Sequence, residues 1–465
     1  MKTMHATMLI AYLILMVLAG IYFSKRKVRN DTDFLVAGRS LPFFVVTGTL
    51  LATFVGSGSV IGGASFVFQN GPGAAIFFFA GTPIGAFIMY WFLARRIRDS
   101  EATTIPELVE SRYGSLARTV ASLIILLAYI GIVSYQFLGG GYALNIAFGL
   151  PTWQGTLISA GIITLLAMLG GLVSVAYTDF ISAIIIFVSM LIGVPIVLSE
   201  LGGVSGMLAA LPSEQRTLTG GLSAWQAISY FLPLFLLLLG DQNLFQRFAA
   251  AKDSGTARRS AMGFMVTGFI SIVLIVLLVS STRVLFPDIN PDTAMLVMAQ
   301  QGLPTVLGAL LLSSVVALIL TTGNSYLLSS SANLTQDIIT GLFKVSIPAA
   351  KRLVFNRISV TALGIVAYVL GAFFPSVLAI QMYSYGMYGA AITPALLAAL
   401  LWKRATSAGG LAGMLTGGAV TLIWEIGLGK PLEWNSVLVA MPLATFALVI
   451  VSLLTQPASS HTQTT

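Results

Sequence analysis

Cysteine is absent from this 465-residue sequence, and histidine occurs only twice, at His5 and His461. The absence of cysteine excludes disulfides, thiolate nucleophiles and iron–sulfur clusters. Because both histidines lie near the ends of the sequence, they cannot build a metal site or a general base in its interior. The phosphate-binding pattern GxxxxGK(S/T) is also missing, which argues against an ATPase.

Charged residues are scarce as well. Only 9% of the residues are charged and 57% are hydrophobic, whereas a soluble domain carries about 25% charged residues. The longest segments between hydrophobic runs, 200–223 and 335–354, are too short for a soluble domain. The composition therefore predicts an all-α protein that crosses a membrane many times.

Apolar runs of about 20 residues, the length that spans a bilayer, follow one another along the whole sequence. We predict thirteen membrane-spanning helices, at 5–24, 44–68, 73–94, 119–147, 153–170, 174–198, 224–240, 261–285, 303–334, 355–374, 377–402, 408–428 and 434–454.

The basic residues predict how these helices are oriented. With the N-terminus outside and the C-terminus inside, every Lys and Arg lies on the inner side except Lys2, Arg216, Arg283 and Lys430. Such a bias is typical of a multi-pass protein of the plasma membrane. The net charge of +8 is thus spread over many short loops, which indicates contact with membrane lipid and excludes nucleic acid as a partner.

Glycines interrupt the second predicted helix, 44–68. Four of them, Gly56, Gly58, Gly62 and Gly63, fall within eight positions and favour a break in the helix. An unwound backbone is tolerated inside a membrane only where it faces protein or a water-filled cavity. Broken helices at the bilayer midplane are typical of secondary transporters, whose freed carbonyls coordinate an ion.

The ninth predicted helix ends in a polar cluster at 321–331, with seven hydroxyl or amide side chains in eleven residues. Isolated Ser and Thr residues in helices commonly bond to their own backbone, but this explains a cluster less well. The hydroxyls of Thr321 and Thr322, facing carbonyls released by the break, would supply the several oxygens that a hard monovalent cation needs. That the two segments meet is a hypothesis.

Asp179, in the sixth predicted helix, is the clearest charge within a span. A carboxylate there is costly and suggests an ion ligand or a proton relay. A partly hydrated carboxylate favoured by the helix dipole is the alternative interpretation. Glu425 lies near the outer end of its helix beside Lys430, where we expect a rim position without a role in coupling.

Five stretches, in this order, resemble the sodium/solute symporter family, which includes bacterial proline, pantothenate, sialic acid and galactose carriers. They are FLVAGRSL at 34–41, ATFVGSGSVIGG at 52–63, GGLVSVAYTD at 170–179, QRFAAAK on a predicted inner loop at 246–252, and the polar stretch 321–337.

The resemblance implies a five-plus-five inverted-repeat transporter with extra helices outside the repeats. The corresponding units would be an extra N-terminal helix at 5–24, a first repeat at 44–198, a second repeat at 224–402, extra C-terminal helices at 408–454 and a tail at 455–465.

The resemblance also implies ligands for the coupling ion. A sodium ion would be held by the carbonyls of Ala52, Val55 and Leu318 and by the hydroxyls of Thr321 and Thr322. A second site, present in some relatives, would use Asp179, Thr321, Asn324 and Ser325. Asn324 replaces a hydroxyl there, which keeps an oxygen ligand but adds bulk. No cofactor other than Na⁺ as coupling ion is implied.

The expected solute pocket differs from the better-known members. Leucines at 234 and 236–239 stand where sugar carriers have Asn and Tyr and proline carriers have Trp and Tyr, and Phe77–Phe79 stand where sugar carriers have an acid. Sugar is therefore disfavoured, because unpaired polar groups each cost about 1–3 kcal/mol, and proline is not supported. The polar candidates for binding solute are Ser57, Ser59, Gln136, Gln381, Tyr383 and Tyr385. We expect a small, partly apolar organic solute, such as a carboxylate attracted by free amides at the break.

These features predict a sodium-coupled symporter that imports its solute by alternating access. A proton-coupled carrier using Asp179 is the alternative within the same class. An ion channel fits less well, because the polar groups lie on separate interrupted segments and form no ring. A membrane enzyme is disfavoured, because the predicted spans hold no paired carboxylates, nucleophile–histidine set or metal cluster.

Overall fold

The computed structural model describes residues 2–27, 36–169 and 172–456. Several residues named above lie outside this described part: Phe34, Leu35, Gly170, Gly171, His461 and the tail from 457 onward.

The described residues form helices joined by loops and contain no β-strand, only an isolated bridge between Leu41 and Ala251. The α-helices are α1 (Lys2–Lys27), α3 (Phe43–Phe54), α4 (Ala64–Phe79), α5 (Gly81–Ile88), α6 (Ala94–Asp99), α7 (Ile105–Tyr113), α8 (Ser115–Phe148), α9 (Thr152–Leu169), α10 (Leu172–Glu200), α11 (Gly203–Ala210), α12 (Ala224–Gly240), α13 (Gln242–Ala249), α14 (Ser254–Leu285), α15 (Ala294–Val297), α16 (Thr305–Ala332), α17 (Ala349–Gly371), α18 (Val377–Ala391), α19 (Thr393–Leu401), α20 (Ser407–Leu422) and α21 (Val437–Leu454). Wider π-helical turns occupy Gly58–Gly63, Met89–Leu93, Met298–Gly302, Asn333–Leu342 and Ile423–Gly427, and 3-10 turns occupy Ala37–Arg39, Glu214–Arg216, Pro291–Thr293 and Pro431–Glu433.

Ten helical segments in the described chain are long and apolar enough to cross a membrane, and three further apolar helices are shorter. The shorter ones are Met4–Gly20, Phe43–Phe54 and Thr152–Met168. One of them, Phe43–Phe54, is short because the predicted helix 44–68 breaks in its middle. The all-helical membrane architecture is thus confirmed, while the number of thirteen crossings stays a prediction.

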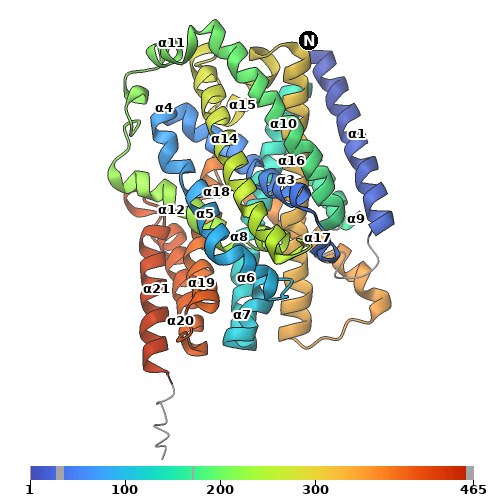
Figure 1. Cartoon of the computed structure of the whole chain (residues 1–465), viewed down its shortest axis with the longest axis vertical. Helices are drawn as coiled ribbons and strands as arrows, with labels where there is room; N and C mark the ends of the chain where they lie inside the picture. Colours follow the sequence, from blue (N-terminus) through green and yellow to red (C-terminus); the bar gives the residue numbers. More distant parts are fainter. Residues whose placement is uncertain (1, 28–35, 170–171, 457–465) are drawn as a thin grey trace, which may run out of the picture.

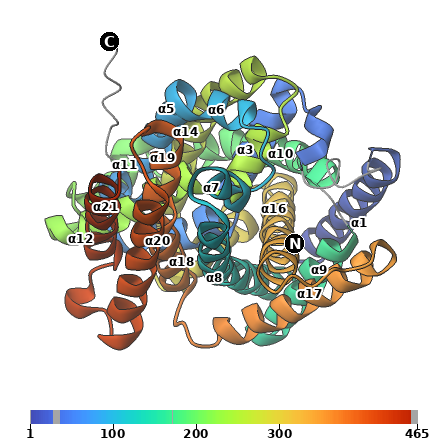
Figure 2. The same ribbon diagram turned by 90° about the horizontal axis from the view of Figure 1, so that it is seen from below.

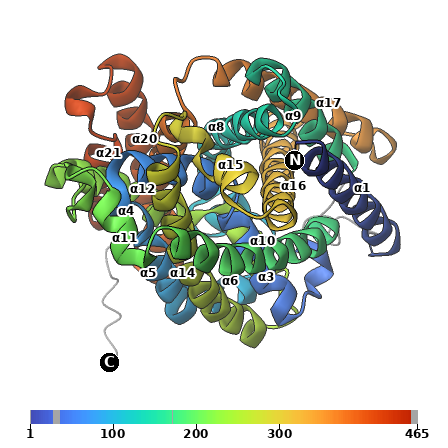
Figure 3. The same cartoon turned by 90° about the horizontal axis from the view of Figure 1, so that it is seen from above.

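The helices are arranged around two long central ones, α8 and α16. Seen from below and from above, α1 and α17 lie at one edge of the molecule, and α20 and α21 lie at the opposite edge (Figures 2 and 3). α1 begins at one end of the molecule and α21 ends at the other (Figure 1). The helices expected to lie outside the repeats are therefore peripheral.

Among the described helices, two are broken in the buried interior of the protein. α3 ends at Phe54, Val55 leaves helical geometry with φ −86° and ψ 32°, and the backbone coils again from Gly58. α12 ends at Gly240, Asp241 is extended with φ −66° and ψ 124°, and α13 follows at once. The two breaks interrupt the first helix of each predicted repeat.

The second break corrects an expectation. The stretch 246–252 was expected on an inner loop, but residues up to Ala249 belong to α13, and Arg247 is fully buried. The reason is that Asp241 accepts hydrogen bonds from the N–H groups of Asn243 and Leu244, which starts a new helix directed into the protein.

The glycines of the first break allow close approach of neighbouring helices. A Cβ atom at Gly58 would lie 2.5 Å from the Tyr385 hydroxyl, and one at Gly62 would lie 1.9 Å from Gln381 Oε1. Both partners belong to α18. The backbone of the break is therefore covered by protein, as its position within a membrane requires.

Small residues also set the packing of α20 on α18. A Cβ at Gly417 would lie 2.6 Å from the backbone oxygen of Ala390, whereas one at Gly418 would make an ordinary 3.6 Å contact with Ile124. We expect Gly417→Ala to lower the free energy of unfolding by about 1–3 kcal/mol, because backbone cannot yield as a side chain can. Gly418→Ala is the matched control and should leave it nearly unchanged. Equal unfolding midpoints for the two variants in SDS titrations would contradict this packing.

Candidate functional site

The first break leaves backbone oxygens without donors. Val55 N–H donates to Leu51 O, and the N–H groups of both Ser59 and Val60 donate to Gly56 O. Among the described residues, no backbone N–H therefore bonds to the carbonyls of Ala52 or Val55 across the break. Both residues are fully buried, so these oxygens are available to a cation inside the protein.

α16 passes directly beside this break. A Cβ at Gly56 would lie 3.1 Å from Thr322 Oγ1, so the backbone of the break and the Thr322 hydroxyl are neighbours. Thr321 Oγ1 donates to Leu318 O at 3.3 Å. The structure thus brings together the two segments whose meeting the sequence left as a hypothesis, and it places all five expected sodium ligands in the buried centre of the protein.

A buried ion pair between Asp179 of α10 and Arg247 of α13 lies next to these residues. It contacts α3 and α16 about one helical turn from the expected sodium ligands. Arg247 Nη2 lies 3.2 Å from Asp179 Oδ2, and both side chains are at most 2% exposed. Thr49 Oγ1 donates to the same carboxylate oxygen at 2.7 Å. Arg247 also donates to Thr49 Oγ1 at 2.9 Å, to Asn243 O at 3.1 Å and to Ser325 Oγ at 3.4 Å. The guanidinium therefore connects α3, α10, α13 and α16.

At the expected second ion site, these hydrogen bonds use only some of the oxygen atoms. Asp179 Oδ1 and Asn324 Oδ1 are buried and have no hydrogen-bond partner in the described structure. Ser325 Oγ donates to Thr321 O at 3.0 Å while it accepts from Arg247. Asp179 is 1% exposed and paired with Arg247, which does not fit the interpretation of a partly hydrated carboxylate. Glu425 accepts from the Ser436 N–H at 2.9 Å, at the edge of the molecule.

Four of the six residues expected to bind solute surround the break. Gln136 Oε1 accepts from the Ser57 N–H at 3.1 Å. The Ser57 hydroxyl and Gln381 Oε1 are buried without partners in the described structure. Tyr385, named with them from the sequence, bonds to the Tyr135 hydroxyl at 3.1 Å and lies against Gly58.

Two other expected residues are used elsewhere. The Ser59 hydroxyl donates to Phe54 O and closes the end of α3. Tyr383 packs on Phe374 with ring centroids 5.6 Å apart. Because Tyr383 and Tyr385 are two positions apart on a helix, they point to different faces, and only Tyr385 reaches the break.

Apolar side chains cover another side of the break. A Cβ at Gly63 would lie 2.6 Å from Phe79, which together with Phe78 is almost completely buried. Leu234 and Leu236–Leu239 are likewise buried at the end of α12. A solute held here would therefore meet a few hydroxyls and amides on one side and an apolar wall on the other.

The sequence did not reveal the role of Asp241. Its carboxylate accepts hydrogen bonds from the hydroxyls of Tyr129 on α8 and Tyr326 on α16, besides starting α13. The signal was present: Gly240 followed by Asp241 is a helix-ending residue followed by a helix-starting one. The sequence predicts a membrane-spanning helix at 224–240 and does not indicate the helix that follows it from Gln242.

A protein that crosses the membrane many times around two broken helices belongs to the class of secondary transporters. Its sequence matches the sodium:solute symporter family over residues 34–417. The high-affinity proline transporter PutP of Bacillus subtilis is 30% identical over 430 residues, which cover 88% of this chain and 89% of that protein. Sodium/proline symporter 2 of Staphylococcus saprophyticus is 29% identical and covers 91% of this chain and 86% of its own.

Solved structures show the same fold. A Na⁺-coupled sialic acid symporter in a substrate-bound outward-open state has a TM-score of 0.82 at 18% identity and covers 98% of both chains. Mhp1, a nucleobase-cation-symport-1 family transporter in a closed conformation, has a TM-score of 0.60 at 13% identity and covers 92% of this chain and 96% of its own.

The chain belongs to the sodium:solute symporter family. It is a multi-pass plasma-membrane protein that couples sodium to the uptake of a small organic solute, and it is not an enzyme. The inverted-repeat transporter fold, the class of function and the coupling ion expected from the sequence are confirmed.

The buried ion pair yields a stability test. Arg247→Gln should leave Asp179 uncompensated and lower the free energy of unfolding by about 3 kcal/mol or more. Asp179→Asn combined with Arg247→Gln should cost clearly less than the sum of the two single changes, because the double variant has no unpaired charge. Arg95→Gln, in the exposed Arg95–Asp99 pair, is the control and should change it by less than about 0.5 kcal/mol. Additive single and double effects in SDS titrations would show that the buried pair is not coupled.

Proposed function

We propose that sodium binds between the first break and α16, at the carbonyls of Ala52, Val55 and Leu318 and the hydroxyls of Thr321 and Thr322. The observation that carries this proposal is the pair of buried carbonyls without backbone donors beside Thr322. A cation there would link α3 to α16. It would thereby favour the conformation in which the solute site is assembled, so sodium and solute would raise each other's affinity by the same factor.

We propose a second cation station at Asp179, Asn324 and Ser325. It is supported by the two unpaired oxygens, Asp179 Oδ1 and Asn324 Oδ1. Arg247 already supplies a countercharge to Asp179. The family couples transport to sodium, so we do not propose the proton relay that the sequence left open at Asp179.

The orientation follows from the charges. We propose that the N-terminus lies outside and the C-terminus inside, which agrees with α1 beginning at the opposite end of the molecule from the end of α21 (Figure 1). Arg247 is buried and is therefore not an inner-loop charge, but the bias of the other basic residues is unchanged.

Residues 44–198 and 224–402 would form the two repeats, each beginning with a broken helix. The exposed apolar side chains on the outer helices would contact lipid.

For the solute, we propose a small, partly apolar carboxylate of amino-acid size. The supporting features are the Ser57 and Gln136 polar groups, Gln381 on the facing helix, and the wall formed by Phe78 and Phe79. The relatives are named as proline transporters, so proline is the first compound to test. The leucines that replace the aromatic residues of proline carriers favour a different or additional solute.

The sodium site has a test that needs no known solute. Sodium, in place of potassium or choline at fixed pH and ionic strength, should raise the unfolding midpoint, because a ligand bound only by the folded state stabilises it by about 2.7 kcal/mol at 100 times its Kd. Thr322→Ala should abolish the rise and Thr322→Ser should retain it. Ser314→Ala removes another buried α16 hydroxyl, one that bonds to its own helix, and should not affect the rise. A sodium effect that survives Thr322→Ala would place the ion elsewhere.

Uptake into proteoliposomes tests the solute. A sodium gradient should drive accumulation of a small carboxylate, with proline assayed first and galactose as the sugar control. Gln136→Ala should raise the KM about fivefold or more for the accepted solute, because it loses a hydrogen bond in the site. Accumulation of galactose, or of no carboxylate despite a sodium-stabilised protein, would overturn the proposed solute class.

A further inference from the structure

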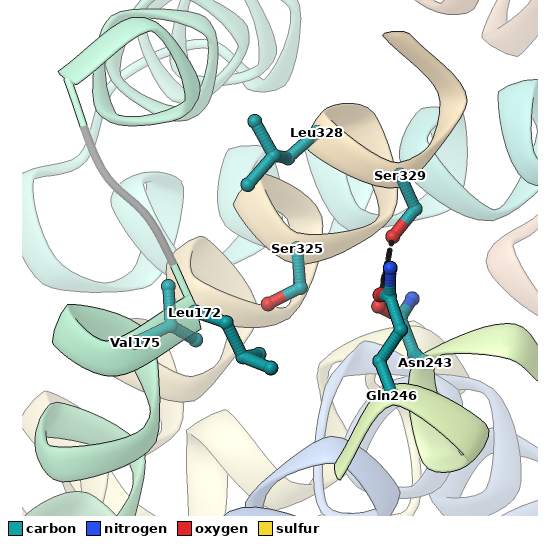
Figure 4. Close-up of a pocket in the computed structure, with 7 residues that line it drawn as sticks. All are labelled: Leu172, Val175, Asn243, Gln246, Ser325, Leu328 and Ser329. Carbon is teal, nitrogen blue, oxygen red and sulfur yellow. Dashed lines mark hydrogen bonds between the residues drawn. The ribbon is translucent and has the colours of Figure 1, made fainter. Parts of the chain in front are cut away.

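A small cavity lies between α10, α13 and α16 (Figure 4). Its volume is about 10 Å³, which is roughly the room for one water molecule. It is lined by Leu172 and Val175 of α10, Asn243 and Gln246 of α13, and Ser325, Leu328 and Ser329 of α16. Hydroxyl and amide groups thus face three aliphatic side chains.

The cavity lies on the side of the proposed sodium site that leads toward the end of α16. Thr321, Ser325 and Ser329 follow one another at intervals of four residues, so they lie on one face of the helix about 6 Å apart. Ser325 borders both the Asp179–Arg247 pair and the cavity. A line of hydroxyls therefore leads from the ion site to the cavity and past it.

Ser329 holds the far side of the cavity closed. Its hydroxyl lies 3.2 Å from Asn243 Oδ1 and 3.1 Å from Gln246 Oε1 (Figure 4). A hydroxyl has one proton, so it donates to only one of these acceptors at a time. Asn243 Nδ2 is buried without a partner in the described structure.

The next contact of α13 has the same character. Gln242 Nε2 donates to Asn333 Oδ1 at 3.2 Å, while Gln242 Oε1 and Asn333 Nδ2 have no partners among the described residues. All of these groups are uncharged. Each bond contributes only about 1 kcal/mol, and each unpaired group carries a desolvation cost that water would relieve. The seam between α13 and α16 is therefore closed by weak bonds and would become hydrated readily.

We infer that this seam, formed by Ser329 against Asn243 and Gln246, is the cytoplasmic gate of the ion path. Separation of α13 from α16 there enlarges the cavity, admits water to Ser325 and Asp179, and opens the route by which sodium leaves. The inference rests on the proposed sodium site and orientation. It adds where the sodium path opens to the cytoplasm and which uncharged hydrogen bonds, those of Ser329, keep it closed.

The absence of cysteine makes the gate directly measurable. Leu328→Cys introduces the only thiol, in the wall of the cavity. In purified protein, a water-soluble maleimide should label it slowly in sodium and at least threefold faster in choline, because sodium favours the conformation closed on this side. Phe343→Cys, 66% exposed beyond the end of α16, is the control and should label equally in both.

Ser329→Ala in the Leu328→Cys background should increase the labelling rate in sodium about fivefold, since it removes the hydrogen bond of the gate. Ser330→Ala is matched to it, because within the described part of the chain the Ser330 hydroxyl bonds only to Tyr326 O of its own helix, and it should leave the rate unchanged. A labelling rate that is the same in sodium and in choline, or that changes equally in both serine variants, would contradict the proposed gate.

The sodium-dependent rise in unfolding midpoint separates this inference from the proposed sodium site. If Ser329→Ala still shows a rise, which Thr322→Ala lacks, while its labelling accelerates, then Ser329 acts on the gate and is not an ion ligand. If the wild-type protein shows no rise, the sodium site fails. If the rise is present but labelling of Leu328→Cys is unaffected by the ion, the sodium site stands and the gate fails.

Discussion

The structure depends on one constraint: inside a membrane, every backbone polar group must find its partner within the protein. A helix that breaks there must be enclosed, and this chain encloses two breaks. At the first, glycines admit α16 and α18 so closely that a single added methyl group would collide. At the second, the Asp241 side chain replaces the missing backbone acceptors of α13. Beside Thr322 the carbonyls of Ala52 and Val55 accept no backbone N–H, so the same constraint that shapes the fold leaves oxygens at the proposed ion site.

The buried charges follow from the second break. Because α13 is directed inward, Arg247 reaches Asp179, and each charge makes the burial of the other tolerable. The pair joins helices from both halves of the protein, whereas Asp241 joins α13 to α8 and α16 through two tyrosines. These strong contacts surround the weak amide and hydroxyl seam at Ser329. The proposed gate is thus surrounded by a few strong interactions, while its own hydrogen bonds are weak and easily hydrated.

The sequence allowed the membrane helices, the first break and the position of Asp179 within a helix to be predicted, because glycine clusters, apolar runs and lone carboxylates are local signals. The sodium ligands stay a prediction. It did not reveal that Arg247 is buried, since a basic residue after an apolar run is usually in a loop and its partner lies 68 positions earlier. Nor did it show which tyrosine faces the break, because the rotation of α18 is set by packing. In the sequence Tyr383 and Tyr385 are equivalent candidates, and only the structure shows which one contacts the break.

Coupling between the two ends of the transport cycle follows from how α13 is attached. Leu41, just before α3, exchanges hydrogen bonds with Ala250 and Lys252, just after α13, at 3.0 and 3.1 Å. Arg247 adds bonds to Thr49 within α3. The two inner half-helices are therefore one mechanical unit. When α13 separates from α16, α3 must move with it and carry the Ala52 and Val55 carbonyls away from Thr322. For the proposed sodium site and orientation, opening of the seam at Ser329 and loss of the ion ligands would be a single movement, which is the condition for sodium to be released only on one side.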